Sequence, residues 1–232
     1  MSFNPLAIPA AIYGSAIAGR NLLYDLRPGL SHRLPVPVIC IGNLTTGGTG
    51  KTPMTAFLAR YFSRQGLHPA IISRGYGRKQ AKETRWLGPE NPPDDKSPEL
   101  YGDEALMLHQ QLPQIPIVLD GDRIRAARTA IRIFGSDLIL MDDGFQHRRL
   151  HRDFNLVMID SQRMFGNRRL LPAGPLREPM SALERADAVI FNKFDARHPR
   201  FLAEAAPVFS RVPARRIFCA RYSVRNFTCP LN

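Results

Sequence analysis

Residues 47–52, GGTGKT, have the residue types and the order that bind a polyphosphate. Glycines allow positive φ, so the backbone N–H groups can turn toward phosphate oxygens. Lys51 is placed to reach the β- and γ-phosphates, and the hydroxyl of Thr52 is placed to hold Mg²⁺. The spacing predicts a phosphate-binding loop with these members: Thr45, Thr46, Gly47, Gly48, Thr49, Gly50, Lys51 and Thr52.

A strand before this loop and a helix after it must position these residues. Residues 36–41 form an apolar run typical of a buried strand, and apolar residues recur at helical spacing over 54–61. A helix that begins at the loop adds its positive dipole end to the same phosphates. Thr45 stands where the usual loop begins with Gly. A glycine-rich turn without a ligand is therefore the competing interpretation.

A second strand end carries two carboxylates. Residues 138–147, LILMDDGFQH, indicate an apolar strand that ends in Asp142 and Asp143. Sheets that alternate strands with helices bind ligands at the carboxyl ends of their strands. A carboxylate there can hold Mg²⁺ directly or through water, and Asp142 is the first candidate, followed by Asp143. The competing interpretation is a pair of solvated turn residues before Gly144.

Three other segments could contribute to a site. Asp103 and Glu104 begin a helical pattern, where acidic residues commonly stabilise the helix N-terminus. The Gly/Pro-rich segment 166–179 could aim guanidinium groups at phosphate, or could be a structural crossover with solvated side chains. Its charged residues of interest are Arg168, Arg169, Arg177 and Glu178. Residues 192–195, NKFD, match the pattern by which many GTPases bind guanine, which keeps a GTPase as an open alternative.

Apolar runs and helical patterns alternate along the chain. The expected strands are 36–41, 69–73, 115–119, 137–141, 155–159, 188–191 and 217–220. The expected helices are 54–61, 101–112, 122–134 and 181–185, and the polar segment 74–98 is expected to be a loop. This alternation predicts an α/β fold of the P-loop NTPase kind, with a mostly parallel sheet and helices on both faces.

The net charge of the chain limits the classes of partner that it favours. The 232 residues include 32 Lys and Arg against 20 Asp and Glu, a formal net charge of +12. This excess suits anionic partners such as phosphates or an acidic lipid surface. No nucleic-acid partner is expected, because the arginines are scattered without an aromatic-basic surface motif. The three cysteines form no CxxC pattern, which is typical of a reducing cytosolic compartment.

The N-terminal segment differs from the rest in composition. Residues 5–19 carry no charge, and Arg20, Arg27 and Arg33 follow them. The uncharged stretch is shorter than the roughly 20 residues of a membrane-spanning helix. It favours either an amphipathic helix on an anionic membrane face or a helix packed on the domain. We therefore predict a helical unit within residues 1–34 and a P-loop core over 35–232.

Seven segments together resemble the tetraacyldisaccharide 4'-kinase family of the lipid A pathway. They are IGNLTTGGTGKTP, ISRGYGRK, YGDEALML, DRIRAAR, MDDGFQHRRLHRD, FGNRRLLPAGPLREP and ADAVIFNKFD, in the family's order. The resemblance implies a kinase that moves the γ-phosphate of ATP to the 4'-hydroxyl of tetraacyldisaccharide 1-phosphate, a lipid A disaccharide precursor. It also implies work at the cytoplasmic face of the bacterial inner membrane, with a membrane-associating helix in residues 1–34.

The resemblance implies a role for individual residues as well. Asp103 would be the catalytic carboxylate that receives the proton of the acceptor hydroxyl, with Lys51 beside the phosphates. The implied Mg²⁺ ligands are Thr52, Asp142, Glu104 and Gln146. The implied contacts to phosphate or sugar are Arg123, Arg177 and Glu178. Family members continue into a region with an Asp-His-His-type motif, which the present tail lacks, so an inactive nucleotide-binding fragment is the alternative.

Overall fold

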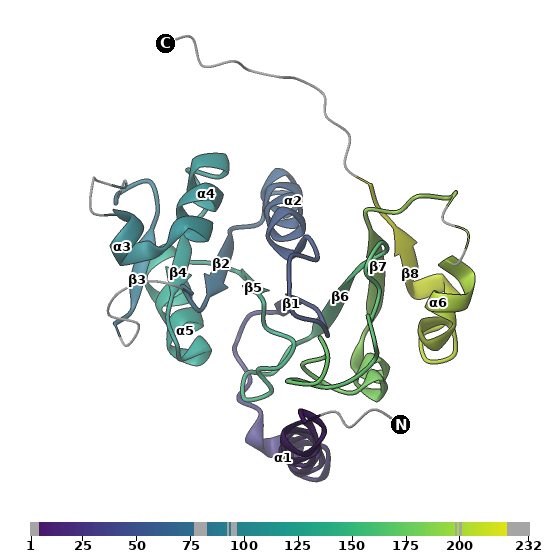
Figure 1. Cartoon of the computed structure of the whole chain (residues 1–232). Coiled ribbons are helices and arrows are strands. Elements are labelled where there is room, and N and C mark those ends of the chain that lie inside the picture. Colours follow the sequence, from purple (N-terminus) through teal and green to yellow (C-terminus); the bar gives the residue numbers. More distant parts are fainter. Residues whose placement is uncertain are drawn as a thin grey trace.

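One eight-stranded sheet forms the centre of the computed structural model, which describes residues 5–76, 83–91, 93, 97–197, 199 and 201–221 (Figure 1). The strand order is β3-β4-β2-β5-β1-β6-β7-β8. The strands are β1 (Val38–Gly42), β2 (Pro69–Ser73), β3 (Arg85–Leu87), β4 (Ile117–Leu119), β5 (Leu138–Asp142), β6 (Phe154–Asp160), β7 (Ala188–Asn192) and β8 (Ile217–Cys219). Every neighbouring pair is parallel except β3 with β4. The mostly parallel sheet predicted from the sequence is confirmed.

Helices cover both faces of this sheet (Figure 1). The helices are α1 (Ala7–Leu26), α2 (Lys51–Arg64), α3 (Ser97–Tyr101), α4 (Asp103–Gln111), α5 (Arg123–Phe134) and α6 (Phe201–Phe209), with 3₁₀ turns at Pro28–Leu30, Met180–Arg185 and Ala214–Arg216. In β5, Leu138 and Leu140 join the core under α2 and α4, whereas Ile139 and Met141 join the core under α5 and α6. Successive strand residues point to opposite faces, so continuous apolar strands are buried on both sides.

Three local differences separate the structure from the sequence expectations. The helical pattern over 101–112 is two helices, because Gly102 between them has φ 81°. A Cβ at Gly102 would lie 2.9 Å from the carbonyl oxygen of Tyr76, so the chain turns there in a conformation that suits glycine. Strand β3 lies in a segment expected to be a loop, and α6 was not predicted. Residues 77–79 of the ISRGYGRK motif and the tail residues 222–232 lie outside the described residues.

Helix α1 lies against the rest of the domain with none of its 20 residues buried. Figure 1 shows it beyond the end of β1, on the side opposite α2. Its exposed apolar residues include Ile8, Ile12 and Leu26, which are 66%, 68% and 72% exposed. Among the described residues, no helix has both the length and the hydropathy that a membrane crossing requires.

Candidate nucleotide and phosphoryl-transfer site

The predicted phosphate loop connects β1 to α2, which begins at Lys51. Gly47 and Gly50 have φ of 102° and 87°, so the prediction of positive φ is confirmed for them; it is wrong for Gly48, which does not have positive φ. The side-chain amide of Asn43 donates to the hydroxyl of Thr49 at 3.0 Å. This hydrogen bond links the two ends of the loop at the N-terminus of a 14-residue helix, where backbone N–H groups favour an anion.

The NKFD segment supports the loop from β7. The Asn192 side-chain amide donates to the carbonyl oxygen of Thr49 at 3.0 Å. The Lys193 ammonium lies 2.6 Å from a carboxylate oxygen of Asp160 and 3.3 Å from the carbonyl oxygen of Gly48. The sequence pattern drew attention to Asn192 and Lys193, but it did not predict that they hold the phosphate loop in place.

Asp142 lies beside this loop because β5 pairs with β1 in parallel, with Ile41 opposite Asp142. Its carboxylate accepts from the Thr55 hydroxyl at 3.1 Å and lies 3.4 Å from the Thr52 hydroxyl. Burial, with the nearby charge of Asp143, raises the pKa of Asp142 to about 6. Asp142 and Thr52, which the family resemblance implies as Mg²⁺ ligands, therefore lie in close contact.

The Asp143 carboxylate contacts two positively charged side chains of the cleft. The Arg177 guanidinium lies 3.0 Å from both carboxylate oxygens of Asp143, and the Lys51 ammonium lies 3.5 Å from one of them. Burial alone would raise the pKa of Asp143, but the charges of Lys51 and Arg177 hold it below its usual value. Two cations thus meet at the N-terminus of α2, where a phosphate would arrive.

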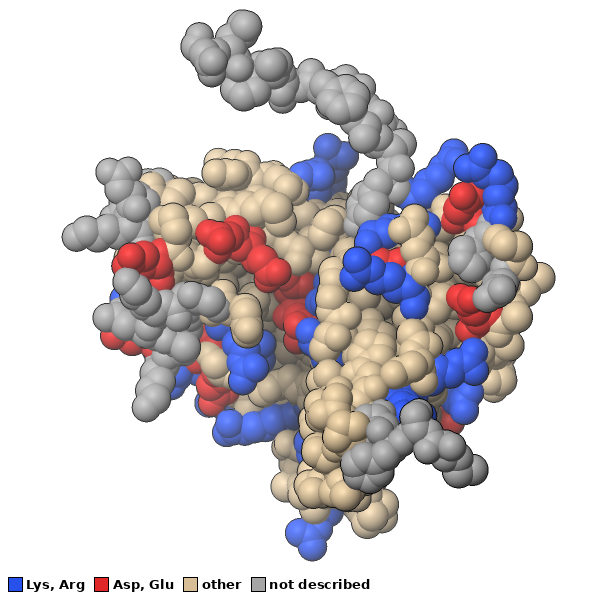
Figure 2. Space-filling view, in the orientation of Figure 1, with Lys and Arg blue, Asp and Glu red and all other residues tan. Residues whose placement is uncertain are grey.

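Lys51, Thr52, Asp142, Asp143 and Arg177 line a cleft of about 960 Å³. Three further predicted residues line it as well: Glu104, Gln146 and Arg123. Figure 2 shows acidic and basic side chains meeting in a hollow near the centre of this face. Arg123 is buried and donates to the carbonyl oxygen of Asp120 at 2.8 Å; burial, with the charge of Arg74, lowers its pKa to about 10. Most of the site predicted from distant segments is brought together here.

Four residues of the predicted site are not among those that line the cleft: Thr45, Thr46, Asp103 and Glu178. Asp103 is exposed at the start of α4 and is not among the residues that line the cleft, although its neighbour Glu104 is. Glu178 is fully buried and forms ion pairs with Arg20 of α1 and with Arg185. Glu178 therefore anchors α1 to the core in this structure, away from the lining of the cleft.

Helix α1 contributes residues that the sequence patterns did not assign to the site. Tyr13, Ile17 and Arg20 line the cleft, and the Tyr13 hydroxyl donates to the carbonyl oxygen of Arg177 at 2.8 Å. Because 164 residues separate Tyr13 from Arg177, no local pattern could have predicted this contact. The helix thus touches the backbone of the residue that pairs with Asp143.

The residues present fit a Mg²⁺ ion. Mg²⁺ in phosphate sites keeps several waters and uses one or two carboxylates, with the remaining ligands from the phosphates. Thr52 and Asp142 offer one hydroxyl and one buried carboxylate side by side. Within the described ranges no group of three or more His, Cys, Asp or Glu could hold a metal by itself. This donor set suits an ion that arrives with a polyphosphate.

The fold and this site define a protein of the P-loop NTPase fold class, with a cleft at its phosphate loop. A family model for LpxK, the tetraacyldisaccharide-1-P 4'-kinase, matches residues 3–226. A tetraacyldisaccharide 4'-kinase of Pseudomonas entomophila is 46% identical over 80% of this chain and 54% of that protein; one of Geobacter sulfurreducens is 44% identical over 81% and 53%. The crystal structure of LpxK from Aquifex aeolicus in complex with ATP has a TM-score of 0.72 at 37% identity, over 80% of this chain and 57% of that one.

The chain belongs to the tetraacyldisaccharide-1-P 4'-kinase family. It spans about half the length of the curated relatives that it matches. The resemblance stated from the sequence motifs is confirmed.

Proposed function

We propose that the protein transfers the γ-phosphate of ATP to the 4'-hydroxyl of a tetraacyldisaccharide 1-phosphate, in lipid A biosynthesis at the cytoplasmic face of the inner membrane. The observation that carries this proposal is the convergence of Lys51, Thr52, Asp142 and Arg177 at the N-terminus of α2. Family membership names the reaction, and the ATP complex of the Aquifex aeolicus relative supports the choice of nucleotide.

The residues of the cleft suit a reaction that depends on alignment and charge neutralisation. Lys51 and Arg177 now share Asp143, and they would turn to the phosphate oxygens when a nucleotide enters. Mg²⁺, held by Thr52 and Asp142, would add charge at the β- and γ-phosphates. The 4'-oxygen would form a bond to γ-phosphorus as the bond to the β-phosphate oxygen breaks. Asp103 would receive the hydroxyl proton, and ADP would leave.

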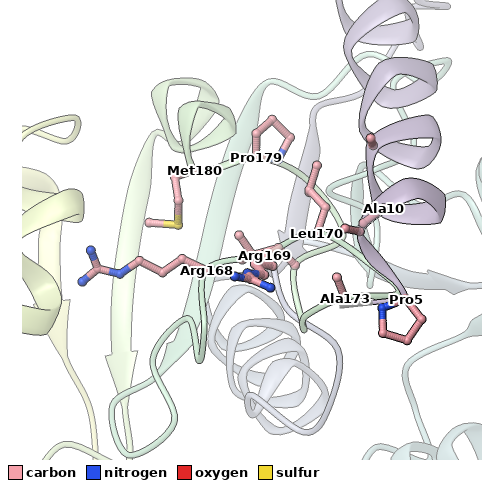
Figure 3. A pocket seen from close by; sticks show the side chains of 11 residues that line it. Pro5, Ala10, Arg168, Arg169, Leu170, Ala173, Pro179 and Met180 are labelled. Atoms are coloured by element: carbon pink, nitrogen blue, oxygen red, sulfur yellow. The ribbon is translucent and has the colours of Figure 1, made fainter. Parts of the chain in front are cut away.

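An apolar groove beside the cleft suits the acyl chains of such a substrate. It has a volume of about 940 Å³ between the start of α1 and the loop 168–180. Figure 3 shows Leu170 and Ala173 of this loop next to Ala10 and Pro5, while the side chain of Arg168 extends away from them. A groove with apolar walls and arginines at its edge matches a lipid that carries phosphate.

The direct test is product formation by the full chain. We expect Mg-ATP and tetraacyldisaccharide 1-phosphate in mixed micelles to give a bisphosphorylated lipid detectable by mass spectrometry. ATP should support the reaction better than GTP, because the related LpxK of Aquifex aeolicus was crystallised with ATP. Preference for GTP would favour the GTPase alternative. Bound ATP without any product would favour an inactive nucleotide-binding fragment.

The two acidic residues at the start of α4 can be separated by substitution. Asp103→Asn should lower kcat about a hundredfold with the KM for ATP unchanged. General base catalysis contributes about 10²–10⁴ in rate, and the lower value is expected here because a loose phosphoryl-transfer transition state depends little on removal of the hydroxyl proton. Glu104→Gln should chiefly raise the Mg²⁺ concentration needed for half-maximal rate, because Glu104 lines the cleft near Asp142. A larger loss of kcat in Glu104→Gln than in Asp103→Asn would move the base to Glu104.

Helix α1 should also affect the rate. Tyr13→Phe removes the hydroxyl that donates to Arg177 and keeps the ring. One hydrogen bond is worth about 1 kcal/mol, so we expect kcat/KM to fall about fivefold. Tyr24→Phe is the matched control, because the Tyr24 hydroxyl has no hydrogen-bond partner in the part of the chain that the structure describes, while its ring stays beside Arg148. Equal effects of both substitutions would contradict a specific role for Tyr13.

A further inference from the structure

A second basic pocket lies where α1 ends, outside the nucleotide cleft. It has a volume of about 560 Å³, and its walls include Tyr24 and Asp25 of α1 and the turn at Pro28. Four arginines line it, and we name it the arginine pocket after them: Arg33, Arg148, Arg152 and Arg185. None of the four belongs to the residues that line the nucleotide cleft.

The carboxylates near the arginine pocket do not balance its charge. Arg148 pairs with Asp25 at 2.7 Å. Arg185 pairs with Glu178, which is also the partner of Arg20 outside the pocket. Five guanidinium groups therefore share these two carboxylates. Two further carboxylates contact other lining residues, Asp153 at His151 and Asp187 at Asn155. The guanidinium groups still outnumber the carboxylates, so the surroundings favour an additional anion.

Arg33 and Arg152 have donors available for that anion. The Nη1 group of Arg152 donates hydrogen bonds to the carbonyl oxygens of Phe145 and His147, each at 3.1 Å. Neither Arg33 nor Arg152 forms an ion pair with any carboxylate among the described residues. Arg33 is exposed, so one side of the pocket is open to solvent.

Burial makes an excess of positive charge and an unused donor costly in this pocket. Burial, followed by the charges of neighbouring arginines, lowers the pKa of Arg152 and of Arg185. The Nη1 atom of Arg185 is buried without a hydrogen-bond partner among the described residues. A desolvated cation with an unused donor is stabilised when an anion enters.

The surface next to the pocket is apolar. Leu22, Leu23, Leu26 and Leu30 are all exposed, and they lie in or beside the segment that forms the α1 wall of the pocket. Figure 2 shows a largely uncharged surface over α1. An anion that carries long apolar chains would satisfy both features, because exposed leucines on a helix beside basic groups are typical of membrane-surface binding.

We propose that the arginine pocket binds the phosphate of an anionic phospholipid whose acyl chains lie along the exposed leucines of α1. The planar guanidinium group matches phosphate oxygens in a two-pronged geometry. This site would fix the protein on the membrane at the end of α1 away from the phosphate loop. It is separate from the proposed phosphoryl transfer and does not depend on it.

The test measures binding of the full chain to vesicles by sedimentation, without nucleotide or substrate. Vesicles of phosphatidylcholine with phosphatidylglycerol should bind the chain more tightly than phosphatidylcholine alone. Each arginine near an anionic surface contributes about fivefold, so Arg33→Gln should lower the affinity for phosphatidylglycerol vesicles about fivefold, and Arg33→Gln with Arg152→Gln about 25-fold. Binding to phosphatidylcholine alone should not change. The exposed Arg33 gives a variant that is expected to fold even if substitution of Arg152 disturbs folding.

Arg64→Gln is the matched control, because Arg64 is exposed at the end of α2 and its loss removes the same charge. An equal loss of vesicle binding in Arg64→Gln would contradict a specific phosphate site in the arginine pocket, because it would show that only the net charge of the protein attracts it to the anionic vesicle. Vesicles given the same charge by oleate should bind less tightly, and equal binding would overturn selectivity for phosphate. If Arg33→Gln instead raised only the KM for the 1-phosphate lipid, the pocket would serve the substrate and the proposal would be wrong.

Discussion

Replacing Lys51 with alanine should lower kcat for lipid phosphorylation about a thousandfold. Lys51 begins α2, and its ammonium lies 3.5 Å from Asp143, in the cleft that Arg177 also lines. Removal of one preorganised positive group from a site where charge develops costs about 10²–10³ in rate. In a phosphate loop this lysine also reaches the β- and γ-phosphates, so the loss should fall at the upper end of that range.

The measurement is the initial rate of bisphosphorylated lipid formation at saturating ATP. Arg64→Ala is the control, since it removes a cation from the opposite end of the same helix, where the side chain is exposed. Circular dichroism should show the same helix content in both variants. A Lys51→Ala rate within tenfold of the unchanged protein would place the transferred phosphate away from the N-terminus of α2.

The sequence predicted the parts of the site that depend on neighbouring residues. A strand, three glycines and a helix specify the phosphate loop locally, because glycine permits the positive φ found at Gly47 and Gly50. Asp142 could be placed beside Thr52 because parallel strands bring their carboxyl ends to one edge of a sheet. Arg177 and Gln146 were proposed from the family resemblance, and both line the cleft.

Contacts between distant segments could not be predicted in this way. Glu178 was expected near phosphate or sugar, but burial makes a carboxylate require cationic partners, and Arg20 and Arg185 supply them. Nothing in the local pattern of residues 166–179 indicates that α1 passes beside this loop. The break at Gly102 was missed for a related reason, since apolar spacing over 101–112 continues across it while the approach of Tyr76 sets the turn.

Replacing Asp142 with asparagine should have opposite effects on activity and on stability. Activity should fall about a thousandfold, because the buried carboxylate beside Thr52 is the group expected to hold Mg²⁺. The free energy of unfolding at pH 7.5, without metal or nucleotide, should instead rise by about 1–3 kcal/mol, since one pKa unit corresponds to about 1.4 kcal/mol. Burial raises the pKa of Asp142 from 3.8 to about 6, so the ionised carboxylate destabilises the folded protein.

The sign of this effect is set by proton binding to Asp142. Between pH 3.8 and about 6 the folded protein holds a proton on Asp142 that the unfolded chain has lost. The contribution of Asp142 to stability is therefore fully present below pH 3.8 and is lost as the pH rises through about 6. The amide of the Asp142→Asn variant does not titrate, so the stability advantage of that variant should grow from about pH 4 to about pH 7 and stay constant above.

Urea unfolding of both proteins across this pH range measures the rise in the stability difference and its constant value above about pH 7. Glu90→Gln is the control, because it makes a carboxylate-to-amide change at an exposed residue that has no ion-pair partner among the described residues. A variant that is less stable than the unchanged protein at pH 7.5 would mean that the hydroxyls of Thr52 and Thr55 stabilise the carboxylate more than burial destabilises it. A metal ligand is expected to combine these two effects, weakening the fold while being required for turnover. In the absence of the ion, the buried negative charge of the ligand is uncompensated, and the bound ion supplies the opposite charge.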